Sequence, residues 1–338
     1  MSVALTGKTS RRIALAGQRL AVAGLMMLLV GCQGATVITT DLATSPPTST
    51  PAAARTAAPS SEPAASTGSA VPVAPTVTLV TAGDIGRCDS DADERTAELA
   101  ATLPGTVLVL GDNAYEDGSR REYRDCYAPS WGRLLERTLA VPGNHDHHTE
   151  GAEAFFDYFG SRAGPAGLGW YAETLGAWHL ITLDSECDRV GGCERGSRQY
   201  EWLAAELADH PAVCTVIAFH RPRYSSGYHG DFDDVDPLWR LAVEAGADIV
   251  LNGHEHSYER LGPMDADGRA DESGARVFIT GTGGAPLRGF KAPVETSQIR
   301  IDDRFGELVL ELADGSYRWA FRSTPDGTVE DEGSGACH

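Results

Sequence analysis

The chain is poor in positive charge and almost without lysine. Of its 338 residues, 28 are Lys or Arg and 48 are Asp or Glu, which gives a formal net charge of -20. Lysine occurs only at Lys8 and Lys291. A surface that follows the phosphates of a nucleic acid needs clustered Lys and Arg. The composition therefore argues against such a surface, and we expect no nucleic-acid partner.

The sequence also lacks an apolar run long enough to span a bilayer. Leu20 to Val30 is apolar but too short for a stable membrane helix, and basic residues precede it. This pattern predicts a signal peptide over residues 1–32. The stretch ends in Leu29-Val30-Gly31-Cys32, which resembles a bacterial lipobox, so we expect Cys32 to carry a lipid anchor. A cysteine beside an ordinary cleavage site is the alternative, and export by the Sec or the twin-arginine route stays open.

Aromatic residues are missing from the next segment, residues 33–76, which consists mainly of Ala, Ser, Thr and Pro. Such a composition cannot bury enough apolar surface to fold alone. We therefore expect a disordered stalk here, which would hold a folded domain over residues 77–338 away from the membrane.

No Cys-x-x-Cys pair occurs, which argues against a thiolate zinc site. Without Cys32, six of the seven cysteines remain, an even number suited to disulfides in an oxidising compartment. Six cysteines allow 15 pairings, and only the short spacing around Gly191-Gly192 favours one of them. We predict the pairs Cys187 with Cys193, Cys88 with Cys126, and Cys214 with Cys337.

Short apolar, β-rich runs alternate with helical patterns from residue 77 onward, which predicts an α/β domain with two mixed sheets and outer helices. The predicted strands are Val77 to Ala82, Thr106 to Leu110, Thr138 to Val141, His179 to Leu183, Val213 to Phe219, Asp248 to Leu251, Val277 to Thr280 and Glu307 to Leu312. The clearest helical patterns cover Ala92 to Thr102 and Gln199 to Ala208.

Five polar clusters stand at or just after the ends of predicted strands, where open α/β sheets place their sites. They are Gly83-Asp84-Ile85-Gly86, Gly111-Asp112-Asn113-Ala114-Tyr115, Gly143-Asn144-His145-Asp146, His220, and Gly253-His254-Glu255-His256. Each alone could be a helix cap, a turn or a core histidine. Together their carboxylate, amide, imidazole and phenol groups suit Fe, Zn or Mn. We expect the glycines to turn the backbone so that the next side chains share a cleft.

These clusters resemble the calcineurin-like metallophosphoesterases and, within them, the purple acid phosphatases. The resemblance runs from about Val77 to Thr324. Its most discriminating residue is Tyr115, because purple acid phosphatases use a tyrosine there as a phenolate ligand to ferric iron; an aromatic packed under a loop is the alternative. The segments 253–260 and 279–284 also resemble that subfamily's last metal block and its glycine turn.

The resemblance implies an αββα sandwich of two mixed sheets and a centre of two metal ions, Fe(III) and a divalent Fe, Zn or Mn. It assigns Asp84, Asp112, Tyr115 and His256 to the first ion, and Asp112, Asn144, His220 and His254 to the second. Asp112 would bridge them, and a metal-bound hydroxide would attack phosphorus. His145 is expected to contact the phosphate and His229 to protonate the leaving group.

Some residues depart from the family pattern or lack a role in it. Only one histidine, His229, stands at the substrate-facing place, since Gly230 follows it. Four carboxylates lie just beyond and would repel highly anionic substrates if they faced the site: Asp231, Asp233, Asp234 and Asp236. His147 and His148 have no assigned role, and we expect them at the surface.

The sequence thus favours a secreted phosphoesterase, lipid-anchored on the extracellular face of the cell membrane, that acts as an acid phosphatase on small phosphate monoesters. A phosphodiesterase on the same cage is the nearest alternative. A surface lipoprotein that binds a metal or ligand without catalysis, and a redox-active iron protein, are alternatives of other classes.

Overall fold

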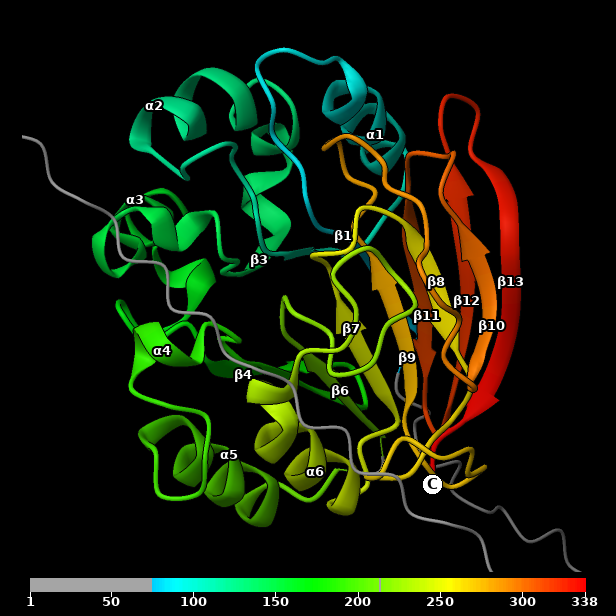
Figure 1. Cartoon of the computed structure of the whole chain (residues 1–338). Helices are drawn as coiled ribbons and strands as arrows, with labels where there is room; N and C mark the ends of the chain where they lie inside the picture. Colours follow the sequence, from blue (N-terminus) through cyan, green and yellow to red (C-terminus); the bar gives the residue numbers. More distant parts are fainter. Residues whose placement is uncertain (1–74, 213) are drawn as a thin grey trace, which may run out of the picture. The chain divides into compact units, whose positions relative to one another are not determined.

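A computed structural model describes residues 75–212 and 214–338. Within this part of the chain two mixed β-sheets of six and seven strands pack face to face, with helices on their outer faces (Figure 1). The predicted αββα sandwich is confirmed. The predicted signal peptide, Cys32 and nearly all of the predicted stalk lie outside the described residues. Over the described ranges, no helix combines the length and apolarity needed to cross a membrane.

The six-stranded sheet has the order β13-β12-β11-β1-β2-β3, and its parallel part is β1-β2-β3. The strands are β1 (Val77–Ala82), β2 (Thr106–Leu110), β3 (Thr138–Val141), β11 (Gly306–Ala313), β12 (Ser316–Ser323) and β13 (Thr328–Ala336). Leu108 and Leu110 of β2 face the other sheet, whereas Val107 and Val109 face the helices. This alternation buries both faces, as a central strand requires.

The seven-stranded sheet has the order β10-β8-β9-β7-β6-β5-β4, and β5, β6, β7 and β9 run parallel. Its strands are β4 (Tyr171–Leu175), β5 (Trp178–Thr182), β6 (Cys214–Ala218), β7 (Ile249–Asn252), β8 (Tyr258–Leu261), β9 (Arg276–Thr280) and β10 (Ser297–Ile301). Every predicted strand has its counterpart, while β4, β8, β10, β12 and β13 were not predicted.

Helices cover the outer face of each sheet. On the six-stranded sheet lie α1 (Ala92–Ala101) and α3 (Glu153–Phe159), with the short α2 (Arg120–Glu122) nearby. On the seven-stranded sheet lie α5 (Arg198–Asp209) and α6 (Asp236–Glu244), with the short α4 (Cys187–Val190) beside them. Ser197 caps α5 by accepting a hydrogen bond from the Tyr200 N–H, which fixes where that helix begins.

The described residues contain three disulfides, and all three predicted pairs are confirmed. Cys88 pairs with Cys126, Cys187 with Cys193, and Cys214 with Cys337, with Cα separations of 4.7, 5.2 and 5.3 Å. The last pair joins the start of β6 to the segment after β13. It therefore ties the two sheets together at the edge away from the loops that follow β6 and β7.

Candidate metal centre

The polar clusters come together because the parallel strands of both sheets end at the same edge. Asp84, Asp112, Asn144, His220 and His254 each stand two or three residues beyond the last residue of β1, β2, β3, β6 and β7. Backbone hydrogen bonds join these loops: the Asp84 N–H donates to Gly111 O at 3.0 Å, and the Gly253 N–H donates to His220 O at 3.0 Å. The Gly83 N–H also donates to Thr280 O at 2.8 Å, which joins the loop after β1 to the end of β9, so the two sheets contribute to one site.

Three of the site residues have a left-handed backbone, which non-glycine residues rarely adopt. The φ angles of Asp84, Asp112 and His254 are 59°, 49° and 70°. Such conformations cost about 1–3 kcal/mol each and persist where the surroundings enforce them, typically at functional sites. The backbone thus turns at these side chains as well as at the preceding Gly111, whose φ is 87°. Gly143 serves close approach instead, since a Cβ there would lie 2.3 Å from the Asp112 backbone nitrogen.

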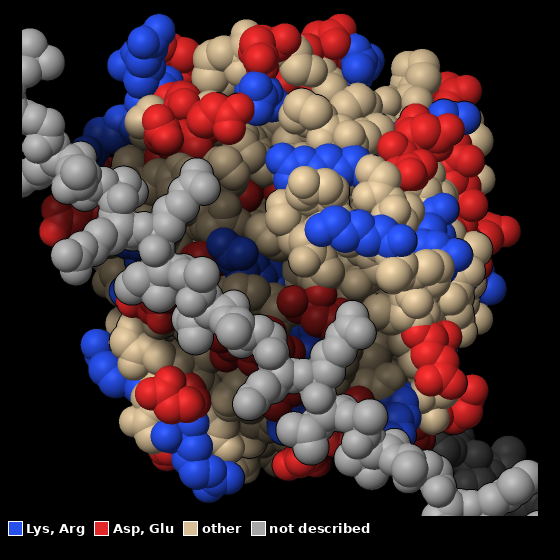
Figure 2. Space-filling model, in the orientation of Figure 1, with Lys and Arg blue, Asp and Glu red and all other residues tan. Residues whose placement is uncertain are grey.

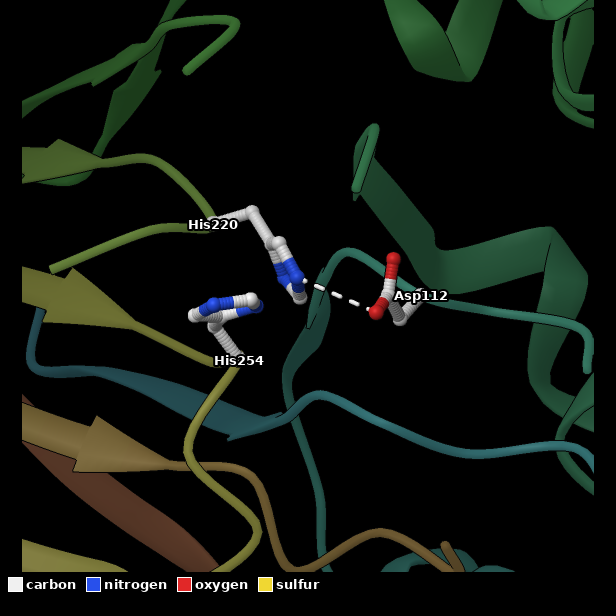
Figure 3. A group of neighbouring side chains, drawn as sticks. All are labelled: Asp112, His220 and His254. Atoms are coloured by element: carbon white, nitrogen blue, oxygen red, sulfur yellow. Dashed lines mark ion pairs between the residues drawn. The ribbon is translucent and has the colours of Figure 1, made fainter. Parts of the chain in front are cut away.

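One side of the site, which we call the histidine half, consists of His220, His254 and Asn144 next to Asp112. One ligand-type atom each from Asp112, His220 and His254 lies within 4.8 Å of the other two, and all three residues are buried. Figure 3 shows these side chains converging from three loops. Nε2 of His220 lies 3.2 Å from Oδ2 of Asp112.

Unpaired polar atoms in the histidine half fit a cation. Nδ1 of His220 donates to the Leu110 carbonyl at 2.8 Å, so in the neutral ring the lone pair of Nε2 points toward Asp112. Nε2 of His220 and Oδ1 of Asn144 are buried and have no hydrogen-bond partner among the described residues. Buried acceptors without donors are costly, and a positive ion bound to them would remove that cost.

The charges of the histidine half are strongly coupled. Burial alone would raise the pKa of Asp112, but the imidazoles of His220, His145 and His254 outweigh it and hold that pKa below its ordinary value. Burial would lower the pKa of His220, but the negative charge of Asp112 raises it to about 9. Burial and the positive charge of His220 hold the pKa of His254 well below its ordinary value. His254 is therefore already in the neutral form that a metal ion binds.

The other side, which we call the tyrosine half, consists of Asp84, Tyr115 and His256, again next to Asp112. Oη of Tyr115 lies 2.8 Å from Oδ1 of Asp84, 3.3 Å from Oδ2 of Asp112 and 3.2 Å from Nε2 of His256. Burial, together with the negative charges of Asp112 and Asp84, raises the pKa of Tyr115 well above its ordinary value. The ring is thus not simply packed under a loop. Its oxygen points into the cage.

Both histidines with proposed catalytic roles border the cage. The His145 N–H donates to Oδ1 of Asp112 at 2.7 Å, and its ring lies 4.4 Å from that of Tyr115. His229 stacks on His254 with ring centroids 4.3 Å apart. Nε2 of His229 accepts a hydrogen bond from Nη1 of Arg288 at 3.0 Å. To donate a proton from that atom, His229 must first give up this bond.

Two expectations about neighbouring residues need correction. His147 is buried rather than exposed, because its Nε2 lies 2.8 Å from Oδ2 of the buried Asp184, whereas His148 is exposed as expected. Two carboxylates beyond His229 are neutralised: Asp233 and Asp236 contact Arg223 at 3.0 and 2.8 Å. The positive charge of Arg223 offsets part of the negative charge of these two carboxylates, so they repel an anionic substrate less than the sequence suggested.

The sequence reasoning missed two residues beside the cage. Glu255 is buried and accepts hydrogen bonds from the His229 and Gly230 N–H groups at 2.7 and 2.9 Å, so it fixes the loop that carries His229. Arg221 points its Nη1 at Nε2 of His254, 3.4 Å away, and its Nε contacts Glu186 at 2.5 Å. Both residues are sequence neighbours of predicted metal ligands: Glu255 lies between His254 and His256, and Arg221 follows His220. This adjacency is the feature of the sequence that could have indicated them.

The chain matches a known protein family. The family model described as "Calcineurin-like phosphoesterase" matches residues 77–258. "Purple acid phosphatase 15" of Arabidopsis thaliana is 25% identical over 240 residues, which cover 60% of this chain and 44% of that relative. "Purple acid phosphatase 18" of the same plant is 25% identical over 285 residues, 75% of this chain and 61% of the relative. The chain thus spans about half of the length of these curated relatives.

A solved structure shares the fold. The purple acid phosphatase PPD1 from yellow lupin (Lupinus luteus) seeds superposes with a TM-score of 0.68 at 18% identity, covering 78% of this chain and 54% of that one. At this identity the likeness shows the fold alone. The family match covers more than half of the chain, and the site lies where the strands of that fold end. The chain belongs to the calcineurin-like phosphoesterase family, with purple acid phosphatases among its relatives.

Proposed function

We propose that the protein is a dinuclear-metal phosphoesterase that hydrolyses small phosphate monoesters, as an acid phosphatase of the purple type. One observation carries the proposal. Oδ2 of Asp112 lies 3.2 Å from Nε2 of His220 and 3.3 Å from Oη of Tyr115. A single carboxylate oxygen thus faces both halves of the cage, as a group shared by two cations must.

In this proposal the tyrosine half and Asp112 hold Fe(III), and the histidine half and Asp112 hold a divalent Fe, Zn or Mn ion. The donor sets support this division. Two carboxylates and a phenol suit a hard trivalent ion, while two imidazoles and an amide oxygen suit a borderline divalent ion. The family implies a dinuclear centre of iron and another metal, and the identity of both ions is part of the proposal.

Two cations at this site would activate water at moderate pH and neutralise charge on the phosphate. The protein's own groups supply the rest. The His145 N–H holds Asp112 in place, and its ring borders the space where a phosphate would bind. His229 stands beside His254 at the mouth, within reach of a leaving group once Arg288 moves from its Nε2.

The test is steady-state hydrolysis by the purified full-length chain of a phosphate monoester and of the matching bis-ester. We expect the monoester to be cleaved faster and hydrolysis to stop in His254→Ala. His210→Ala is the matched control, because His210 is an exposed histidine at the end of α5. Faster bis-ester cleavage would turn the proposal into a phosphodiesterase. A His254→Ala variant as active as wild type would refute the metal-centre account.

We further propose that the protein acts on the extracellular face of the cell membrane, tethered through a lipid on Cys32 and the stalk over residues 33–76. The lipobox-like Leu29-Val30-Gly31-Cys32 supports this proposal. Metabolic labelling with a radioactive fatty acid is expected to mark the wild-type chain but not Cys32→Ser. Equal labelling of both chains, or of neither, would contradict the anchor.

A further inference from the structure

Two cations and an exposed aromatic ring lie together at the mouth of the cage, and we call Tyr228, Arg288 and Lys291 the basic rim. Nζ of Lys291 lies 4.4 Å from the centroid of the Tyr228 ring, and Cζ of Arg288 lies 5.8 Å from it. Tyr228 is 51% exposed, which is unusual for a large side chain in this fold. Solvent therefore reaches this group directly.

The basic rim is continuous with the cage. Arg288 donates to Nε2 of His229, and the ring of His229 stacks on His254 of the histidine half. A phosphoester whose phosphate binds between the two halves would extend its other portion past His229. That portion would then pass Arg288, which contacts His229.

Backbone hydrogen bonds hold the basic rim in place. The Arg288 N–H donates to the carbonyl of His256 at 2.9 Å, and Nδ1 of His256 donates to the carbonyl of Pro286 at 2.8 Å. The Lys291 N–H donates to the carbonyl of Ser226, two residues before Tyr228, at 3.0 Å. The rim is thus fixed to the cage on one side and to the His229 loop on the other, which lowers the ordering cost of binding a ligand.

The cations of the basic rim lack carboxylate partners. Within the described residues, neither Arg288 nor Lys291 forms an ion pair, although acidic residues outnumber basic ones 48 to 28 in the chain. Figure 2 shows Lys and Arg side chains that lie among uncharged residues on one face of the molecule, with Asp and Glu side chains in separate groups around them. Two cations without ion-pair partners are suited to bind an anion from outside the chain.

We propose that the basic rim is a subsite for a second acidic group, a carboxylate or another phosphate, on the leaving portion of the phosphoester. The proposal rests on the proposed phosphoesterase function and names its substrate class. Arg288 supplies a planar fork that can bind either group through two hydrogen bonds, and Lys291 adds a point charge. The substrates are then organic phosphates that carry a further negative charge beyond the scissile bond.

The test compares kcat/KM for phenyl phosphate, 4-carboxyphenyl phosphate and 1,4-phenylene bisphosphate. The second and third compounds distinguish a carboxylate from a phosphate as the extra group. For each charged substrate, its kcat/KM is divided by that of phenyl phosphate. We expect the double variant Arg288→Gln/Lys291→Gln to lower at least one of these ratios about tenfold, which is the loss of a charge-assisted hydrogen bond. Arg300→Gln on the edge strand β10 is the matched control and is expected to keep both ratios.

A purely structural role of the rim gives a different pattern. If Arg288 only holds His229, Arg288→Gln slows all three substrates equally and Lys291→Gln changes nothing, and the subsite proposal is overturned. Lys291 is exposed, so its single variant also guards against misfolding as an explanation. Ratios in the double variant equal to those of wild type overturn the proposal as well.

A second measurement separates failure of the subsite from failure of the enzyme. If no phosphoester is hydrolysed, the proposed function fails, and calorimetric binding of benzylphosphonate and 4-carboxybenzylphosphonate to the full-length chain decides the subsite. The basic rim predicts tighter binding of the carboxylated compound by wild type than by the double variant. Equal binding of the two compounds by wild type overturns it.

Discussion

The tyrosine half and the histidine half share Oδ2 of Asp112, but their buried polar atoms are satisfied to different degrees. In the tyrosine half, Oη of Tyr115 has three polar neighbours within 3.3 Å. In the histidine half, Nε2 of His220 and Oδ1 of Asn144 lack hydrogen-bond partners. The tyrosine half thus closes on itself by hydrogen bonds, whereas the histidine half keeps buried polar atoms that suit a bound cation.

The largest expected effect comes from removing the group that both halves share. Asp112→Ala is expected to reduce hydrolysis to background and to lower the content of both metals, because each half loses the same bridging oxygen. Activity and elemental analysis of the purified variant test this. Asp303→Ala removes an exposed carboxylate and serves as the control. Unchanged turnover in Asp112→Ala would end the two-metal account.

The next largest effects distinguish the histidine half from the tyrosine half. His220→Ala is expected to lose one ion and nearly all activity while keeping the visible absorption of the other ion, because Tyr115 lies in the tyrosine half. His256→Ala is expected to change that absorption directly. Metal analysis and visible spectra of the two variants check the comparison. Identical losses in both variants would show that the halves do not bind separately.

A smaller loss is expected from Tyr115→Phe, which removes only the phenol oxygen. The variant should keep its fold and both ions, since Asp84, Asp112 and His256 remain, and turnover should fall by about 10-fold to 100-fold, the range seen when groups that tune a metal site are changed. The violet phenolate-to-iron band should disappear. A band that survives this substitution would place another ligand on the iron.

The smallest effect concerns the support behind the tyrosine half. Asp93 accepts a hydrogen bond from Ser130, and Thr96 donates to the carbonyl of Gly283 in the turn that lines Asp84. Burial raises the pKa of Asp93 to about 7. The folded chain therefore keeps a proton that the unfolded chain loses near its ordinary value of about 4.

Stability should consequently fall as pH rises from about 4 to about 7, because the folded state binds more protons over that range. In Asp93→Asn the decline in Tm from about pH 5 to about pH 8 should shrink by roughly 5–10 °C, which corresponds to about 2–3 kcal/mol. Thermal unfolding at both pH values measures it. A decline of the same size in both chains would mean that Asp93 is ionised throughout.

Much of this site could be predicted because parallel strands place their carboxyl ends at one edge. Apolar runs that end in polar residues indicate Asp84, Asp112 and His220 from the sequence alone. The pair Cys187 and Cys193 followed from short spacing, whereas the other two disulfides had no local signal and are set by the packing of the loops and sheets.

Other features depend on contacts that are distant in sequence. Strand β13 (Thr328–Ala336) is rich in acidic residues and glycine, and it forms only because β12 offers it a partner. His147 is buried by Asp184, 37 residues away, and Arg288 meets His229 across 59 residues. Contacts between residues so far apart in the chain cannot be predicted from the hydrophobic pattern of a strand or from the spacing of residues in a motif.

The most direct test of the metal centre is elemental analysis of the purified full-length chain together with its visible absorption spectrum. The account predicts about two ions per chain, one of them iron, and a violet band that Tyr115→Phe removes. A folded chain that binds no metal under conditions in which iron and zinc are supplied would contradict it.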